Sequence, residues 1–196
     1  VNGKEACFWP FGYNSFPCDV TGLLSADGKN NVLAVRLENR PQSSRWYPGA
    51  GLYRNVRLVT TERVHVPVWG TQLTTPHVSA EYASVRLRTT IRNAGDADVR
   101  ISTDIIAPDG KIVARKDNSR KINHGQPFEQ NFLINAPSLW SPETPYLYKA
   151  VSKIYVDGKQ TDEYTTRFGI RSIEIIADKG FFLNGMLRKF QGVCSH

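Results

Sequence analysis

The most constraining feature of this sequence is a hydrophobic period of two. In residues 85–92, every second side chain is apolar or only weakly polar, and arginines fill most of the positions between. The same alternation recurs in residues 99–105 and, near the start of the chain, in residues 33–37. Because successive side chains of a strand point to opposite faces, this pattern predicts half-buried β-strands with one solvated face.

Turn signals separate these runs at short intervals. Asp-Gly pairs at residues 27–28, 109–110 and 157–158, and Gly95, supply glycine where a tight turn needs positive φ. The runs recur about every 8–12 residues, and no capped amphipathic helix pattern longer than a turn or two occurs, which favours an all-β, antiparallel sandwich. In the central part we expect strands at residues 64–69, 72–79, 84–93, 98–107, 111–117, 127–134, 146–156 and 160–168.

The pattern divides the chain into three parts. Residues 1–62 combine aromatic-rich loops with strands, and residues 63–171 hold enough strands for a complete immunoglobulin-like sandwich. Residues 172–196 begin something new, with a short turn and then a strand over residues 189–193, so we expect an incomplete fold there. The chain also starts without methionine or a leader-type segment, so we expect it to begin inside a longer protein.

Composition argues against two classes of partner. Lys and Arg number 25 against 18 Asp and Glu, a net charge of +7, but the basic residues are scattered singly and form no block typical of nucleic-acid binding. No apolar run comes near the roughly 20 residues of a transmembrane helix. We therefore expect neither a nucleic-acid nor a membrane partner.

The three cysteines are Cys7, Cys18 and Cys194. An odd number at wide spacing is not typical of a disulfide framework. The favoured interpretation of Cys7 and Cys18 is as small buried apolar residues, and a disulfide across a hairpin is the alternative. No Cys-x-x-Cys or paired histidine spacing occurs, so we expect no metal site.

The residues form no self-contained catalytic motif. Neither the G-x-S-x-G pattern nor a Gly-rich phosphate loop is present, and most aspartates lie in turns, where local hydrogen bonds to the backbone explain them. Two stretches, residues 8–13 and 44–53, are dense in aromatic rings and glycine. Such rings can stack on the C–H face of a sugar, although packing at the end of a sandwich core is the favoured interpretation of these stretches alone.

Four segments carry motifs that match a known pattern. They are VNGKEACFWPFGYNSFPCDVT at residues 1–21, NNVLAVR and SRWYPGAGLYRNV within residues 30–56, LWSPETPYLY at residues 139–148, and RFGIR, FLNG and QGVCSH within residues 167–196. In this order they resemble the non-catalytic N-terminal half of glycoside hydrolase family 2, the family of β-galactosidases, β-glucuronidases and β-mannosidases. Two departures are Ala6, where the family has glycine, and Met186-Leu187, where the family's Lys-Pro would set the backbone of the turn.

The resemblance implies a division of the chain and a reaction. Residues 1–62 would be the C-terminal part of a jelly-roll sugar-binding domain, residues 63–171 the immunoglobulin-like domain, and residues 172–196 the start of a (β/α)₈ catalytic barrel. The reaction would be retaining hydrolysis of terminal β-glycosides, β-galactosides first, by two glutamates about 5–5.5 Å apart. Both glutamates lie in the family's barrel beyond residue 196, so no catalytic residue is expected here, and no cofactor or cation is indicated.

The resemblance also implies substrate-binding residues at two places. His196 would end the first barrel strand, where the family's matching histidine contacts substrate; a polar residue at a disordered cut end is the alternative. Ser44, Arg45 and Trp46 match the place where the jelly roll reaches over the barrel mouth. Some β-galactosidases have an aspartate near this place that contacts the galactosyl unit, and Ser44 or Arg45 could serve instead in this sequence.

Carbohydrate substrate is thus the expected partner of the full enzyme. The alternatives are a stand-alone β-sandwich that binds sugar without chemistry, and a purely structural spacer. Residues 1–62 would expose unpaired strand edges if earlier strands of their sheet are missing, which predicts self-association or strand exchange. The compartment stays open, with a bacterial periplasmic or secreted location slightly favoured over a cytoplasmic one.

Overall fold

The structure is a computed structural model that describes residues 1–25, 30–42, 51–92, 95, 97–121 and 126–194. The chain forms two compact units, Val1–Val59 and Thr60–His196. Each unit is built differently, because regular strands occur only in the second one among the described residues.

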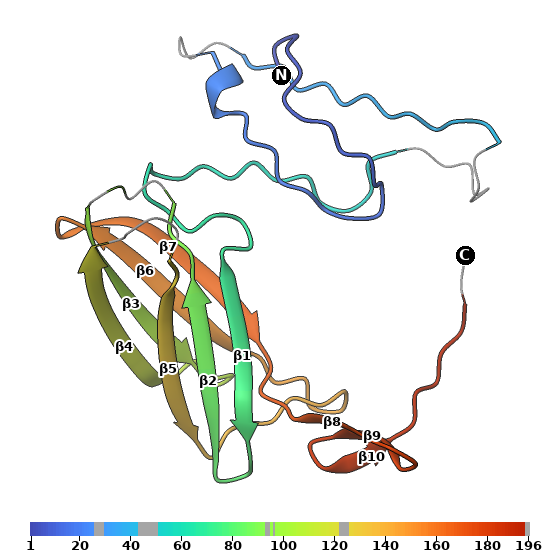
Figure 1. Ribbon diagram of the computed structural model, residues 1–196, viewed down its shortest axis with the longest axis vertical. Coiled ribbons are helices and arrows are strands. Elements are labelled where there is room, and N and C mark those ends of the chain that lie inside the picture. The colour runs from blue at the N-terminus through green and yellow to red at the C-terminus, as the bar shows by residue number, and fades with distance from the viewer. Residues whose placement is uncertain (26–29, 43–50, 93–94, 96, 122–125, 195–196) are drawn as a thin grey trace. The chain divides into compact units, whose positions relative to one another are not determined.

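The second unit is built around an antiparallel β-sandwich (Figure 1). Its strands are β1 (Thr71–Val78), β2 (Tyr82–Thr89), β3 (Asp98–Ile106), β4 (Ile112–Lys121), β5 (Phe128–Asn135), β6 (Tyr148–Val156) and β7 (Lys159–Phe168). One sheet has the order β1-β2-β5 and the other the order β4-β3-β6-β7. This arrangement is immunoglobulin-like and confirms the all-β, antiparallel fold that the period-two pattern predicts.

The strand expected at residues 64–69 is wrong. That segment forms only one isolated bridge, between His65 and Arg92. Pro67 has no backbone N–H to give to a ladder, and its carbonyl instead accepts from Gly70 in a tight turn. Trp69 lies inside this turn with a φ of 58°, which no strand residue adopts.

The core lies between the two sheets and is made by the alternation seen in the sequence. Strand β5 alternates strictly between buried and exposed residues along its whole length. The largest fully buried apolar side chains are Leu87, Ile101, Ile105, Ile134, Ile154 and Ile170. Each such side chain contributes about 1.5–3 kcal/mol relative to an exposed position, so this alternation supplies much of the driving force for folding.

A polar network crosses this apolar core. The fully buried Gln130 on β5 accepts a hydrogen bond from the hydroxyl of Thr103 on β3 at 2.6 Å. Its amide nitrogen donates to the carbonyl of Lys116 at 3.1 Å and to the side-chain oxygen of Asn118 at 3.0 Å, both on β4. The Thr103 hydroxyl also bonds that of Ser152 on β6 at 2.8 Å. These bonds join the two sheets at one register, since a shifted pairing would leave buried polar atoms without partners.

A smaller antiparallel sheet follows the sandwich within the second unit, in the order β10-β9-β8. It consists of β8 (Ile173–Ile176), β9 (Gly180–Leu183) and β10 (Met186–Arg188). The β9–β10 turn is Asn184-Gly185, with φ values of 51° and 75°. These two residues supply the positive φ that a two-residue hairpin turn needs, so the turn forms although Met186-Leu187 replaces the family's Lys-Pro. The strand expected at residues 189–193 is not formed, because no neighbouring strand pairs with it among the described residues.

The first unit has little regular structure. Its described residues contain one short 3₁₀ helix, η1 (Thr21–Leu23), and no helix among the described residues is long and apolar enough to cross a membrane. The strand expected at residues 33–37 is wrong. Leu33, Val35 and Leu37 alternate as a strand would but stay about half exposed or more, since no strand of the described part of the chain pairs with them.

Hydrogen bonds of Asn2 and a disulfide are among the links that hold the described part of the first unit. Asn2 bonds across to Val32 through its backbone N–H and its side-chain oxygen, both at 2.9 Å, and its amide donates to Asn31 at 2.8 Å. Cys7 and Cys18 form a disulfide, with their Cα atoms 6.1 Å apart. The favoured interpretation of both as buried apolar cysteines is therefore wrong, and the alternative is what the structure shows.

Candidate functional site

The residues predicted to bind substrate lie outside the described part of the chain. Ser44, Arg45 and Trp46 belong to residues 43–50, and His196 belongs to residues 195–196. Their roles therefore stay predictions. The structure does describe the residues next to these segments. It also describes the loops that join the sandwich to β8–β10, and the contacts of these loops are given below.

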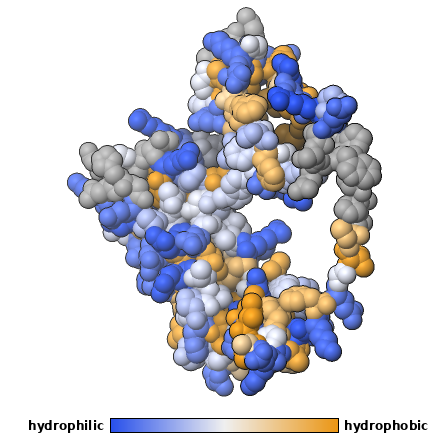
Figure 2. All heavy atoms as spheres, turned by 45° about the vertical axis from the view of Figure 1, so that its right-hand side comes forward, coloured by the Kyte–Doolittle hydropathy of each residue, from blue (hydrophilic) through white to orange (hydrophobic). Residues whose placement is uncertain are grey.

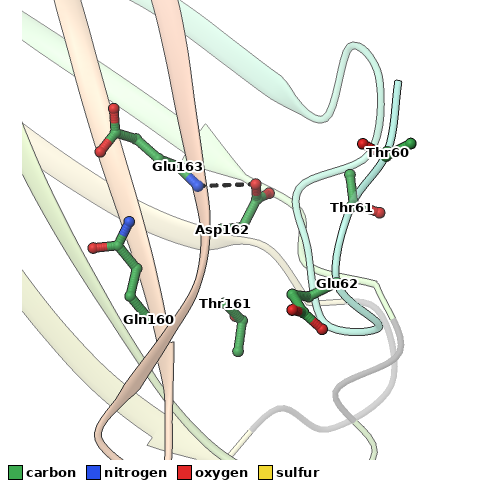
Figure 3. Close-up of a pocket in the computed structure, with 7 residues that line it drawn as sticks. All are labelled: Thr60, Thr61, Glu62, Gln160, Thr161, Asp162 and Glu163. Carbon is green, nitrogen blue, oxygen red and sulfur yellow. Dashed lines mark hydrogen bonds between the residues drawn. The ribbon is translucent and has the colours of Figure 1, made fainter. Parts of the chain in front are cut away.

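An open depression of about 540 Å³ lies beside β7 (Figure 3). It is lined by Thr60, Thr61, Glu62, Gln160, Thr161, Asp162 and Glu163. The Asp162 carboxylate is held by the fold, because it accepts from the backbone N–H of Val66 and of Glu163, both at 2.8 Å. In Figure 3 the Glu163 side chain points away from the loop that carries Glu62, so these two carboxyl groups do not face each other. No cluster that could hold a metal ion occurs among the described residues.

A well-connected polar site of the second unit is centred on Asn184. Its side-chain oxygen accepts from the backbone N–H of Ser172, and its amide nitrogen donates to the carbonyl of Trp140, each at 3.0 Å. Its backbone N–H donates to the carbonyl of Ser172, also at 3.0 Å. One side chain thus joins the β9–β10 hairpin, the start of β8 and the loop of residues 136–147; we call this place the loop–hairpin junction.

A second link of the loop–hairpin junction is an ion pair. Arg188 on β10 makes a fork with the Glu143 carboxylate, with Nη1–Oε1 at 2.7 Å and Nη2–Oε2 at 3.0 Å. The pKa of Glu143 lies below its ordinary value, chiefly because its own backbone N–H and the Ser141 hydroxyl hydrogen-bond to the carboxylate, with Arg188 adding to both. The carboxylate is therefore ionised at neutral pH and is held as an acceptor.

Close packing completes the loop–hairpin junction. The backbone N–H of Trp140 donates to the carbonyl of Ile170 at 2.8 Å, and the Arg171 guanidinium lies 5.1 Å from the Trp140 ring centre. A Cβ added at Gly169 would lie 2.8 Å from Cβ and Cγ of Trp140. Only a residue without a side chain lets the indole approach the backbone this closely.

The other shifted carboxyl groups also favour the ionised form. The pKa of Asp104 is lowered mainly by a hydrogen bond from Arg115, and that of Asp109 mainly by one from Lys111. The pKa of Glu81 is lowered mainly by the Ser79 hydroxyl. A glycosidase acid needs a raised pKa, so these carboxyl groups are tuned the opposite way.

Comparison with known proteins gives these features a context. The model of the family "Glycosyl hydrolases family 2" matches residues 66–171, which is more than half of the chain and contains the whole seven-stranded sandwich. The chain belongs to glycosyl hydrolase family 2. The resemblance to this family is thereby confirmed.

Relatives in this family match along the entire chain. A β-galactosidase of Bacteroides ovatus, BoGH2A, is 41% identical over all of the chain, which corresponds to 24% of that protein. A putative β-glucuronidase of Formosa agariphila is 36% identical, again over all of the chain and 18% of the relative. The crystal structure of a family 2 member from Bacteroides cellulosilyticus aligns with a TM-score of 0.82 at 34% identity, over 95% of this chain and 26% of that one. The chain therefore spans about a quarter or less of these family 2 relatives.

The loop–hairpin junction was missed by reasoning from the sequence, although its residues lie in the quoted motifs. Trp140 and Glu143 belong to LWSPETPYLY, Gly169 to RFGIR and Asn184 to FLNG. The Trp140–Asn184 contact joins residues 44 positions apart, and no periodicity predicts such a contact. The Asn184-Gly185 pair is a local turn signal that could have pointed to this place, but the short turn was expected after it, where the structure has β10.

Proposed function

We propose that this chain is the non-catalytic N-terminal part of a retaining glycoside hydrolase that acts on terminal β-galactosides. The observation that carries the proposal is membership in family 2, together with 41% identity to a β-galactosidase over the full length of the chain. Other relatives are named β-glucuronidases, so the galactoside preference is the finer part of the proposal. Among the described residues, the carboxyl groups with shifted pKa values are all held ionised, which suits a supporting role.

The experiment compares this chain with the full-length parent enzyme on nitrophenyl β-galactoside and β-glucuronide. The parent is expected to hydrolyse the galactoside faster, and the chain alone is expected to show no turnover. Turnover by the purified chain that a galactosidase inhibitor abolishes would overturn the non-catalytic assignment. A parent that prefers the glucuronide would overturn the galactoside assignment alone.

We also propose the domain division that the resemblance implies. Residues 1–62 would be the end of the jelly-roll domain, residues 63–171 the immunoglobulin-like domain, and residues 172–196 the start of the barrel. The exposed alternating side chains of the first unit support this, because a strand pattern without a partner strand suits part of a larger sheet. The exposed apolar side chains of β8–β10 support it as well, and Figure 2 shows apolar side chains at the lower end of the molecule, where Figure 1 places these strands.

Within the parent enzyme, we propose that His196, Arg45, Ser44 and Trp46 contact the sugar. Support comes from the match of their positions to the family's motifs. His196→Ala in the parent is expected to lower kcat/KM about tenfold, the effect of one lost hydrogen bond to the substrate. His77→Ala, on β1 of the sandwich, is the matched control and should leave kcat/KM unchanged; equal kinetics of the two variants would refute the role of His196.

We propose that the isolated chain self-associates through its first unit. Apolar side chains there are largely exposed, among them Val32, Leu33, Leu52, Val56 and Leu58. Extended segments with unpaired backbone groups and exposed apolar side chains invite pairing with a second chain. Light scattering at rising concentration should therefore give a mass above 22.0 kDa; a constant monomer mass would refute this.

A further inference from the structure

The disulfide of the first unit closes a loop with an unusual composition. Cys7 and Cys18 are 11 positions apart, and all residues between them are exposed. Half of the enclosed residues carry aromatic rings: Phe8, Trp9, Phe11, Tyr13 and Phe16. We call residues 8–17 the aromatic loop.

Among the described residues, few other bonds hold the aromatic loop in place. The backbone hydrogen bonds found between described residues of the first unit join Asn2 to Val32, Lys4 to Val1 and Leu23 to Val20, all outside the loop. Inside it, the rings of Trp9 and Phe16 stack with centroids 5.2 Å apart and planes 10° from parallel. A stack of two exposed rings is worth about 0.5–1.5 kcal/mol, which is too little to order a ten-residue segment by itself.

The positions of the stacked rings tie them to the disulfide. Trp9 lies two residues after Cys7, and Phe16 lies two residues before Cys18. The disulfide joins Cys7 to Cys18 and the ring stack joins Trp9 to Phe16, so two successive cross-links bridge the same two stretches of chain. Reduction of the disulfide therefore removes the constraint that keeps the Trp9 and Phe16 rings stacked.

We propose that the Cys7–Cys18 pair is a redox-operated clamp for the aromatic loop. When the clamp closes, the Cys7 and Cys18 thiols lose two protons and two electrons, and one S–S bond forms between them. A dithiol–disulfide oxidoreductase takes the electrons and protons as its own disulfide becomes a dithiol. A dithiol reductant reverses the exchange, and the two cysteines return to thiols while Trp9 separates from Phe16.

Access and compartment set the state of this clamp. Cys7 is exposed, so a partner thiolate can reach its sulfur, and exposed disulfides are the ones most open to exchange. An oxidising compartment keeps the clamp closed, whereas cytosolic thiols open it. The aromatic loop is thereby held only in protein that has reached an oxidising environment.

The test uses the whole chain with Cys194→Ser, so that only the two clamp cysteines can be labelled. Iodoacetamide should label neither cysteine in the purified oxidised protein and both after dithiothreitol, and peptide mapping should find residues 7 and 18 linked. The Trp9–Phe16 stack is followed as the near-ultraviolet circular dichroism that disappears with Trp9→Leu. More than half of this Trp9-dependent signal should be lost on reduction, and the Cys7→Ser/Cys18→Ser variant should lack it under both conditions.

Two results would overturn the proposal. One is labelling of both cysteines without reductant in protein folded under oxidising conditions, which would show that the disulfide does not form. The other is an unchanged Trp9-dependent signal after complete reduction, which would show that the disulfide forms but holds nothing. Far-ultraviolet circular dichroism of the sandwich is the internal control, and it should be the same in all variants because the clamp lies in the other unit.

Discussion

Replacing Gly169 by alanine tests the packing of the loop–hairpin junction. The new Cβ would lie 2.8 Å from both Cβ and Cγ of Trp140 and 3.0 Å from Cδ1. Ordinary carbon–carbon contacts begin at about 3.5 Å, so one of the two segments has to move by roughly half an ångström or more. Trp140 Cβ is fixed to its backbone, and that backbone is hydrogen-bonded to Ile170 and Asn184. Trp140 therefore cannot move away from the new Cβ without straining or breaking these hydrogen bonds.

Overpacking of this kind costs about 1–3 kcal/mol of unfolding free energy. For the second unit, a loss of about 2 kcal/mol lowers Tm by roughly 5–10 °C. The assay is urea unfolding and thermal unfolding followed by circular dichroism of the sandwich. The φ of Gly169 is ordinary, so alanine itself adds no backbone strain and the effect reports the contact alone.

The matched control is Gly192→Ala. A Cβ at Gly192 meets no atom within 4 Å and its φ is also ordinary, so unfolding should change by less than about 0.5 kcal/mol. In the Trp140→Ala background, which removes Cγ and Cδ1, the cost of Gly169→Ala should fall. Gly169→Ala protein as stable as the parent would refute the close packing of these two segments.

The remaining predictions concern polar contacts of the second unit, each measured by urea unfolding. Gln130→Leu should cost about 1–3 kcal/mol, because the buried Thr103 hydroxyl loses its acceptor and two partly buried acceptors on β4 lose their donor; an unchanged midpoint would refute the importance of the inter-sheet network. Asn184→Ala should cost a similar amount, about 1–3 kcal/mol, since Ser172 and Trp140 lose their bonds, and Asn184→Gly, which keeps positive φ available, should not restore it. The pKa of Asp104 is lowered from 3.8 by Arg115, so its ion pair stabilises the fold above that pH and the stabilisation is lost as the pH falls through the lowered value. Asp104→Asn should therefore lose less stability than the parent between pH 7 and 3, and identical pH profiles would contradict this.

Local pattern in the sequence was enough to predict the sandwich. Its strands bury one face, so apolar side chains must recur every second residue, and turns must carry the residues that tolerate positive φ. Seven of the eight central strands predicted from this pattern overlap β1–β7. The remaining predicted strand, at residues 64–69, is wrong because Pro67 has no backbone N–H to donate. Pro67 was a local signal against a strand, and the prediction followed the alternation of the neighbouring residues instead.

Where a strand depends on a partner, local pattern was not enough. Residues 33–37 alternate as well as β3 does, yet they pair with nothing among the described residues. A strand gains its hydrogen bonds and buried area only from a neighbouring strand. Alternation therefore shows that a segment is suited to a sheet, and the presence of a partner strand decides whether the sheet forms. The same holds for residues 189–193 after β10.

What the sequence alone determined is the class of fold and the family, because alternation and motif order are properties of neighbouring residues. Only the tertiary structure decided that Gln130 bonds to two strands of the opposite sheet, that Gly169 lies against Trp140, and that Cys7 bonds to Cys18. Those contacts join residues separated by 11 or more positions. The geometry of these contacts depends on how strands and loops pack against one another. Burial at each contact then determines whether a polar side chain or a glycine can occupy it.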